Sequence, residues 1–443
     1  LEFKENHAHK DSIRVLFWDG NNWIGPLVSQ VWNKTFYDDG IHLKSATVTF
    51  LVNLTEYETV NYYIYYSKYD RGTISFTPMV QGYEDESIDN DYWFQGKYYK
   101  VYTNHLRNGK IEKLWHLITN NEIGNPGSPG NTYFPTHYDP YSTALGNTYG
   151  AAINVEGITE SGPIFIKYHT TAQFSGSYDD KAEITYTFYW FGWVVEVNSS
   201  CNDDVDWSYF YSIWWMFDPG VMPSLYIFRE PNDEEIYENF ATGTWNRVYK
   251  YGNVTRVAFY DTNDGEGVGY GEIDVQAHKF TSYARFHYIY YYYYTYQYWY
   301  KRYNEVVNDA GSWEYEKYVM VVWNATEGLD PFKKMTIEFQ NNPEIEIGEE
   351  RIIFQLKVNV FDGNNNPVPG ANVYVFSGDQ LIQSGITQSN GYIILPIDQE
   401  GTYDILVNYT TSYQQNDEYM TVSAESQAVV EYPDDVFQTV SKD

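Results

Sequence analysis

The stretch Glu183-Ile-Thr-Tyr-Thr-Phe-Tyr-Trp190 decides the fold class of this chain. Its β-branched and aromatic residues alternate with a period of two, which is typical of a β-strand that buries one face. The same alternation recurs at Ser45–Val52, Tyr62–Tyr66 and Phe354–Phe361. We therefore predict an all-β fold made of several β-sandwiches.

Turn-forming residues separate these stretches, and helical periodicity is scarce. Clusters of Asp, Asn, Ser and Gly, which favour chain reversal, stand at Asp19–Asn22, Asp38–Gly40, Asp362–Asn365 and Ser389–Gly391. Only Asn104–Ile118 has a spacing that predicts a short helix.

Composition limits the class of protein. The chain has 443 residues, 43% of them hydrophobic, and a net charge of −32. It is long enough for two to four domains and apolar enough to bury real cores. Its acidity argues against nucleic acid as a partner. Cys201 is the single cysteine, so an internal disulfide and a cysteine-based metal framework are both excluded.

Changes in composition suggest three consecutive regions. The loop-forming run Asn125–Asn131 and the acidic segment after Asn341-Asn342-Pro343 mark their borders. We predict an N-terminal β domain at 1–125, a large aromatic-rich sandwich at 126–341, and a small immunoglobulin-like or transthyretin-like sandwich with a tail at 342–443. The tyrosine run at 288–300 predicts a strand covered by protein on both faces.

The last region resembles a known family. Phe361–Val375, Gly385–Gly391 and Gly401–Val407 follow the strand and turn pattern of the carboxypeptidase regulatory-like, transthyretin-type sandwich. That resemblance implies a spacer module of secreted or surface proteins, without catalytic residues. Ala46–Ser67 is similar to strands of β-rich archaeal and bacterial surface proteins, and the middle region is similar to the large β-supersandwiches of sugar-active proteins.

Six Asn-x-Ser/Thr sequons are candidate glycosylation sites, and N-linked glycans would require export of the chain. Chance alone gives roughly four or five sequons in a chain of this composition, so their number does not establish glycosylation. The six are Asn33, Asn53, Asn198, Asn253, Asn324 and Asn408.

Acidic loops are candidate calcium sites because calcium prefers six to eight oxygen ligands. The candidates are Asp203, Asp204, Asp206, Asp261 and Asp264. The loop starting at Asp261 departs from an EF-hand, since Glu266 occupies the position of the required glycine. The alternative for each cluster is a solvated acidic turn.

No motif argues for an enzyme. The histidines are scattered apart from His7 and His9, and neither His-Glu-x-x-His nor Gly-x-Ser-x-Gly occurs. Glycoside cleavage would need paired carboxylates and exposed rings. The tryptophans available for stacking are Trp190, Trp193, Trp207, Trp214 and Trp215. Trp190, Trp214 and Trp215 lie in apolar runs, which favour core packing instead.

Two functions remain open. We favour an exported structural protein, a subunit of an extracellular filament or surface layer that binds copies of itself through β-strands and aromatic contacts. The alternative is a surface protein that binds or cleaves carbohydrate with the middle domain. No run approaches 18 apolar residues, so we expect no bilayer span in this chain. Because it starts at Leu1, we expect a removed signal segment or excision from a longer product.

Overall fold

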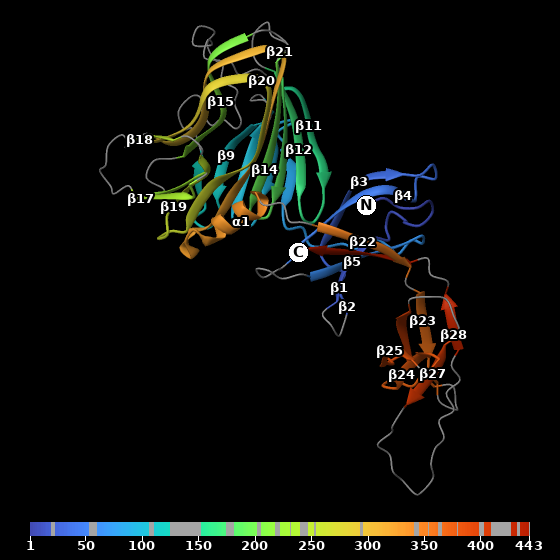
Figure 1. Cartoon of the computed structure of the whole chain (residues 1–443). Helices are drawn as coiled ribbons and strands as arrows, with labels where there is room; N and C mark the ends of the chain where they lie inside the picture. The colour runs from blue at the N-terminus through green and yellow to red at the C-terminus, as the bar shows by residue number, and fades with distance from the viewer. Residues whose placement is uncertain are drawn as a thin grey trace, which may run out of the picture. The chain divides into compact units, whose positions relative to one another are not determined.

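A computed structural model of the chain confirms the all-β prediction (Figure 1). It describes residues 1–18, 23–52, 60–105, 110–124, 152–173, 181–201, 205–217, 222–230, 232–239, 247–251, 254–292, 296–340, 345–352, 354–361, 366–378, 380–397, 403–408, 427–431 and 435–442. For 205–217, 247–251, 277–314, 345–355 and 427–442 we describe the backbone only.

The chain divides into two compact units rather than three consecutive regions. Unit 1 combines Leu1–Ser75 with Glu344–Asp443, and unit 2 is Phe76–Pro343. The border expected near residue 342 therefore coincides with a unit border, whereas the one expected at 125 falls inside unit 2. Composition changes at Asn125–Asn131, but it cannot report that strands before and after this segment share one core.

Unit 2 contains an eleven-stranded antiparallel sheet. Its main order is β11-β12-β13-β14-β21-β20-β19-β16-β17, while β15 pairs with β21 and β18 pairs with β20. The strands are β11 (Ala152–Ser161), β12 (Ile166–Gln173), β13 (Lys181–Tyr189), β14 (Gly192–Cys201), β15 (Val205–Phe217), β16 (Ser224–Arg229), β17 (Glu234–Asn239), β18 (Arg247–Tyr251), β19 (Val254–Tyr260), β20 (Glu266–Tyr292) and β21 (Tyr296–Asn324). The tyrosine run at 288–300 includes the end of β20 and the start of β21. Its side chains are outside the described part of the structure.

A five-stranded sheet forms the second layer of unit 2, in the order β10-β9-β8-β7-β6. Its strands are β6 (Gln81–Glu84), β7 (Tyr92–Gln95), β8 (Tyr99–Asn104), β9 (Lys110–His116) and β10 (Asn121–Gly124). Large rings fill the space between the layers: Phe94 stacks on Phe188 at 3.9 Å, and Tyr99 lies 5.2 Å from Trp193. The two sheets therefore form a sandwich with one continuous core.

The predicted helix at Asn104–Ile118 is wrong, because this segment contains the end of β8 and all of β9. A β-bulge explains the error. Thr103 pairs with Ile111 and Tyr102 with Lys113, so one extra residue lies in β9. The extra residue lets Ile111 and Leu114, three apart, both reach the core, and this spacing imitates a helix.

The opposite face of the large sheet is covered by α1 (Asp330–Gln340), which follows the short 3₁₀ helix η3 (Ala325–Glu327). The helix fits because β20 presents alternate glycines, Gly267, Gly269 and Gly271. A Cβ atom at Gly269 would lie only 2.3 Å from the ring of Phe332 on α1. The ring of Phe332 stacks on Trp323 at 5.1 Å, so aromatic packing stabilises this face as well.

Unit 1 contains a sheet in which distant parts of the sequence pair, in the order β2-β1-β5-β29-β22 (Figure 1). Its strands are β1 (Arg14–Trp18), β2 (Trp23–Ile24), β5 (Val60–Ser67), β22 (Ile345–Ile352) and β29 (Asp435–Lys442), and a hairpin of β3 (Ser29–Phe36) and β4 (Leu43–Phe50) contributes to the same core. β29 pairs with β5 along its whole length, so residues near the end of the sequence complete the N-terminal sheet.

A small sandwich with its own core lies between β22 and β29 in the sequence. One sheet has the order β26-β23-β28 and the other β25-β24-β27. The strands are β23 (Phe354–Asn359), β24 (Asn372–Ser377), β25 (Gln380–Ile386), β26 (Tyr392–Ile397), β27 (Asp404–Asn408) and β28 (Gln427–Glu431). The expected small sandwich is present over a narrower range than 342–443, and its membership of the transthyretin-type family stays a prediction.

Candidate functional site

The outer face of the five-stranded sheet carries a row of aromatic side chains. Tyr83 on β6 pairs with Trp93 on β7, and Trp93 pairs with Tyr102 on β8. Trp115 on β9 lies one row away, opposite Lys100 of β8. Their strand neighbours, such as Phe94 and Leu114, point into the core. We call Tyr83, Trp93, Tyr102 and Trp115 the aromatic face.

The rings of the aromatic face contact one another and carry cations above them. Trp93 lies 4.7 Å from Tyr102 and 5.4 Å from Trp115, measured between ring centroids. The ammonium of Lys100 lies 4.2 Å from the Trp93 centroid, and that of Lys113 lies 5.9 Å from both Tyr102 and Trp115. Tyr83 is 48% exposed, both tryptophans are half-buried and Tyr102 is buried, so part of this aromatic surface reaches solvent.

A buried carboxylate holds one end of the aromatic face in place. Asp91, whose side chain is 2% exposed, accepts hydrogen bonds from the Tyr102 hydroxyl and from the His105 backbone N–H at 2.6 Å. His105 Nδ1 lies 2.7 Å from the same carboxylate, so the imidazole carries its proton on Nδ1. Burial and the neighbouring Asp91 raise the pKa of Tyr102 well above its ordinary value. Both Asp91 oxygens are thus engaged.

A second carboxylate orients Trp93. Asp85 accepts a 2.7 Å hydrogen bond from the Trp93 indole N–H, and its other oxygen accepts from the hydroxyl and the backbone N–H of Ser87. The hydrogen bonds from Ser87 and Trp93 lower the pKa of Asp85 to about 2, so Asp85 is ionised at neutral pH. The indole is therefore fixed at its edge, and its half-buried ring is partly accessible.

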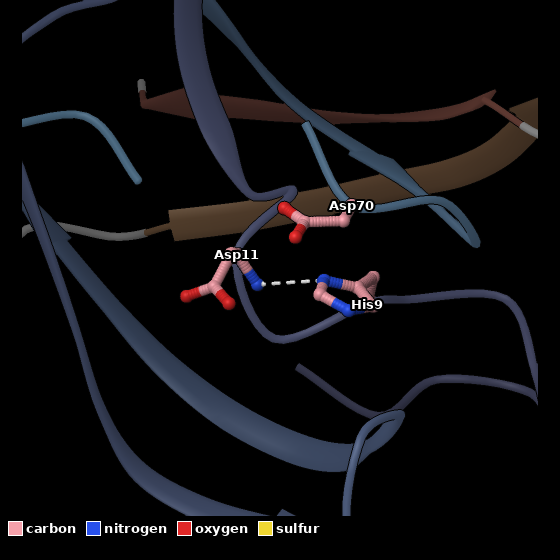
Figure 2. Close-up of side chains that lie close together, drawn as sticks. All are labelled: His9, Asp11 and Asp70. Atoms are coloured by element: carbon pink, nitrogen blue, oxygen red, sulfur yellow. Dashed lines mark hydrogen bonds between the residues drawn. The ribbon is translucent and has the colours of Figure 1, made fainter. Parts of the chain in front are cut away.

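Unit 1 holds a different cluster of ionisable groups, His9, Asp11 and Asp70, shown in Figure 2. One potential metal-ligand atom from each residue lies within 4.8 Å of the other two. The Lys10 ammonium lies 2.5 Å from Asp11 Oδ2, and this hydrogen bond lowers the pKa of Asp11. The cluster thus combines a nitrogen donor with two carboxylates.

The predicted glycosylation sites occupy different environments. Asn33 on β3, Asn198 on β14 and Asn408 on β27 are exposed. Asn324 is half-buried, and its side-chain oxygen accepts from the Thr326 N–H at the start of η3. Asn53 and Asn253 lie outside the described residues. Three sequons therefore have the accessibility that glycosylation needs, while their occupancy stays a prediction.

Two of the predicted calcium ligands, Asp261 and Asp264, have described side chains, and both lie in one turn. Asp261 Oδ1 accepts from the backbone and side-chain amides of Asn263, at 2.8 and 2.9 Å. Asp264 Oδ1 accepts from the Glu266 N–H at 3.0 Å, so both acids stabilise the turn between β19 and β20. Asp206 lies in β15, where only the backbone is described, and Asp203 and Asp204 lie outside the described residues. Calcium at these acids stays a prediction.

The tryptophans proposed for sugar stacking are not those of the aromatic face. Trp193 is fully buried in the core of unit 2, and Trp190 is half-buried against Phe191. Trp207, Trp214 and Trp215 lie on β15, whose side chains are not described. Trp93 and Trp115 were missed, although the alternation in Tyr92-Trp93-Phe94-Gln95 already places Trp93 and Phe94 on opposite faces.

Comparisons with known proteins identify no family. No protein family and no curated protein matches the sequence. A TPR-domain containing protein from Parabacteroides distasonis is 10% identical over 53% of this chain and 47% of its own, with a TM-score of 0.31. A putative aldose 1-epimerase from Klebsiella pneumoniae is 7% identical over 64% of this chain and 89% of its own, with a TM-score of 0.36. A mutant heparan sulfate lyase HepC from Pedobacter heparinus is 10% identical over 74% of this chain and 43% of its own, with a TM-score of 0.32. The chain thus spans about half the length of the first of these structures. At such TM-scores the similarities carry no argument about function.

In the described part of the chain, no helix is long and apolar enough to cross a membrane.

Proposed function

We propose that this is an extracellular or cell-surface protein that binds carbohydrate on the aromatic face of unit 2. The observation that carries the proposal is the placement of Tyr83, Trp93, Tyr102 and Trp115 on the outer side of one sheet. Partly exposed apolar surface with polar groups around it is typical of a binding site.

The chemistry of the aromatic face suits a sugar ring. The face of an aromatic ring carries partial negative charge, which attracts the C–H groups on the apolar side of a pyranose. The ammonium groups of Lys100 and Lys113 lie over the rings and supply hydrogen-bond donors for sugar hydroxyls. The face therefore offers stacking together with hydrogen bonding.

The same contacts favour binding over cleavage. Glycoside hydrolysis needs one carboxyl group as acid and another as nucleophile or base. Asp91 and Asp85 have both oxygens engaged by protein donors, and the pKa of Asp85 is lowered to about 2. These acids orient the rings and are poorly suited to carry a proton to a leaving group.

Binding to a panel of soluble polysaccharides, measured by affinity electrophoresis, tests the proposal. We expect Trp93→Ala and Trp115→Ala to weaken binding at least tenfold, since each removes a stacking surface. Tyr69→Ala is the matched control, because Tyr69 is 53% exposed but lies in unit 1. Equal binding by all variants, or no binding to any polysaccharide in the panel, would contradict the proposal.

A second candidate function is assembly into a filament or surface layer, and the placement of β29 favours it. A strand that completes a sheet far away in the sequence can do the same for another copy of the chain, because the contacts made are identical. β29 pairs with β5 on one side and β22 on the other. We infer that donation of β29 from each copy to the next would produce a polymer.

Engineered disulfides distinguish exchange from internal pairing. In a Cys201→Ser background, Tyr65→Cys and Phe437→Cys place thiols at paired positions of β5 and β29. Exchange predicts covalent dimers and larger species on non-reducing gels. Leu16→Cys with Tyr63→Cys joins β1 to β5 and serves as the control, with an internal bond expected. Internal bonds in both pairs at every protein concentration would exclude exchange.

A further inference from the structure

We propose that His9, Asp11 and Asp70 form a binding site for a zinc-type divalent metal ion in unit 1. This site is independent of the aromatic face and differs from the acidic loops that the sequence suggested. The three side chains lie close together, and the Asp11 N–H donates to His9 Nδ1 (Figure 2).

The backbone brings the three residues together through a buried serine. The His9 N–H donates to the Ser67 carbonyl at 2.7 Å, at the end of β5. The Ser12 hydroxyl, which is fully buried, donates to the His9 carbonyl at 2.8 Å and accepts from the Ser67 N–H at 3.0 Å. The turn that carries His9 and Asp11 is therefore fixed to the strand that leads into Asp70.

Each donor retains capacity for a metal. Asp70 Oδ1 accepts from the Gly72 N–H at 2.7 Å, which orients that carboxylate. Asp11 Oδ2 binds Lys10, while the contact of Oδ1 within the described residues is a long one of 3.5 Å with the Thr73 hydroxyl. His9 Nδ1 accepts a long hydrogen bond from the Asp11 N–H at 3.2 Å.

The donor set selects the class of metal. Imidazole nitrogen and carboxylate oxygen are both ligand types of zinc, and three protein ligands leave a fourth position for water. Calcium is disfavoured, because it prefers oxygen ligands and a larger number of them. Tetrahedral coordination at about 2.1 Å places donor atoms about 3.4 Å apart, so the side chains have to approach by at most about 1.4 Å.

His42 is excluded as a fourth ligand even though its ring centroid lies 6.0 Å from that of His9. Its Nδ1 lies 2.5 Å from Asp39 Oδ2, and its Nε2 lies 3.0 Å from the Lys68 carbonyl oxygen. Both nitrogens are thus engaged. Water is therefore expected to complete the coordination of the ion.

Titration of the chelator-treated full-length protein with Zn²⁺ tests the site by calorimetry, and Co²⁺ reports tetrahedral coordination through its visible absorption. We expect about one equivalent to bind, with affinity reduced at least tenfold in His9→Gln and in Asp70→Asn. Lys10→Met should bind more tightly, because it removes the cation that competes for Asp11. His169→Gln, a histidine of unit 2 lying 4.0 Å from Glu156, is the matched control and should bind as the unmodified protein does.

Two results would overturn the proposal: no Zn²⁺ binding by the unmodified protein, or the same affinity in His9→Gln and Asp70→Asn. Circular dichroism of the metal-free variants verifies that they are folded. Asp70 is exposed, so Asp70→Asn keeps the test valid even if His9→Gln does not fold. Tighter binding by Lys10→Met separates this site from adventitious binding elsewhere on an acidic protein.

Discussion

The two faces of the five-stranded sheet use the same kinds of residue for different ends. On the inner face, Phe94 stacks on Phe188 and Tyr99 packs near Trp193, so each ring contacts rings of the large sheet. On the outer face, Trp93 contacts Tyr102, Lys100 and Asp85. The comparison teaches that aromatic content does not reveal what a ring does, because its neighbours on the other layer decide it.

Substitutions of the adjacent residues Phe94 and Trp93 on β7 should show the largest difference between the two faces in the free energy of unfolding. We expect Phe94→Ala to lower the free energy of unfolding by about 3–5 kcal/mol, since it leaves a cavity between two sheets. Trp93→Ala should cost about 1–2 kcal/mol, because the ring is only half-buried. Urea denaturation at neutral pH measures both values. Equal losses would show that the outer rings are part of a core.

We expect acid to lower the free energy of unfolding through His116, on the inner face of the five-stranded sheet. His116 is buried with its Nε2 3.0 Å from the Trp323 carbonyl oxygen, and burial lowers its pKa to about 4. The unfolded chain therefore takes up the proton first as pH falls. The contribution of neutral His116 is fully present above about pH 6.5, and about 3 kcal/mol is lost between 6.5 and 4.

His116→Gln checks this assignment because glutamine does not titrate. Its free energy of unfolding should depend less on pH between 6.5 and 4 than that of the unmodified protein. His169→Gln, which changes a half-buried histidine, should keep the full dependence. Identical pH profiles for all three proteins would place the acid sensitivity elsewhere.

Substitution of Tyr102 tests whether its hydrogen bond to the buried Asp91 stabilises the outer face. Tyr102→Phe keeps the ring but removes the hydroxyl that donates to Asp91. We expect a loss of about 1.5–3 kcal/mol in the free energy of unfolding, since the acceptor is a buried carboxylate. Polysaccharide binding should persist because the ring remains. If stability is unchanged, the His105 donors alone satisfy Asp91.

We expect substitution of Lys100 to change the free energy of unfolding least among these variants. Lys100→Met keeps the aliphatic stem over Trp93 but removes the ammonium 4.2 Å from the ring centroid. We expect the free energy of unfolding to fall by about 0.5–1 kcal/mol, measured by urea denaturation. Lys44→Met, on β4 of unit 1, should change it by less. A larger loss would mean that the cation is needed to hold the outer rings together.

Local alternation was enough to predict the fold class. Glu183–Trp190 largely coincides with β13, and the similar stretches near 45, 62 and 354 coincide with β4, β5 and β23. The bulge in β9 made Asn104–Ile118 resemble a helix in sequence, because one extra residue changes which side chains share a face. Helix α1 was also missed, since the glycines that receive it lie on β20, far away in the sequence.

The candidate sites depended on pairings that a single sequence does not contain. Trp93 and Phe94 differ in role only because a second sheet covers one of them. Asp70 joins His9 and Asp11 because the end of β5 lies beside the turn that follows His9. Spacing along the chain could identify neither relation, whereas it could flag Asp261 and Asp264, which are neighbours in one turn.

The position of β29 has a consequence for synthesis on the ribosome. β5 presents an unpaired edge from the time it emerges until Asp435–Lys442 arrive to pair with it. At about 5–20 residues per second, the intervening segment of roughly 370 residues takes about 20–70 s to make. During that time β5 has unpaired backbone N–H and C=O groups that can pair with strands of other nascent chains. We therefore expect folding in the cell to depend on keeping this edge from such contacts.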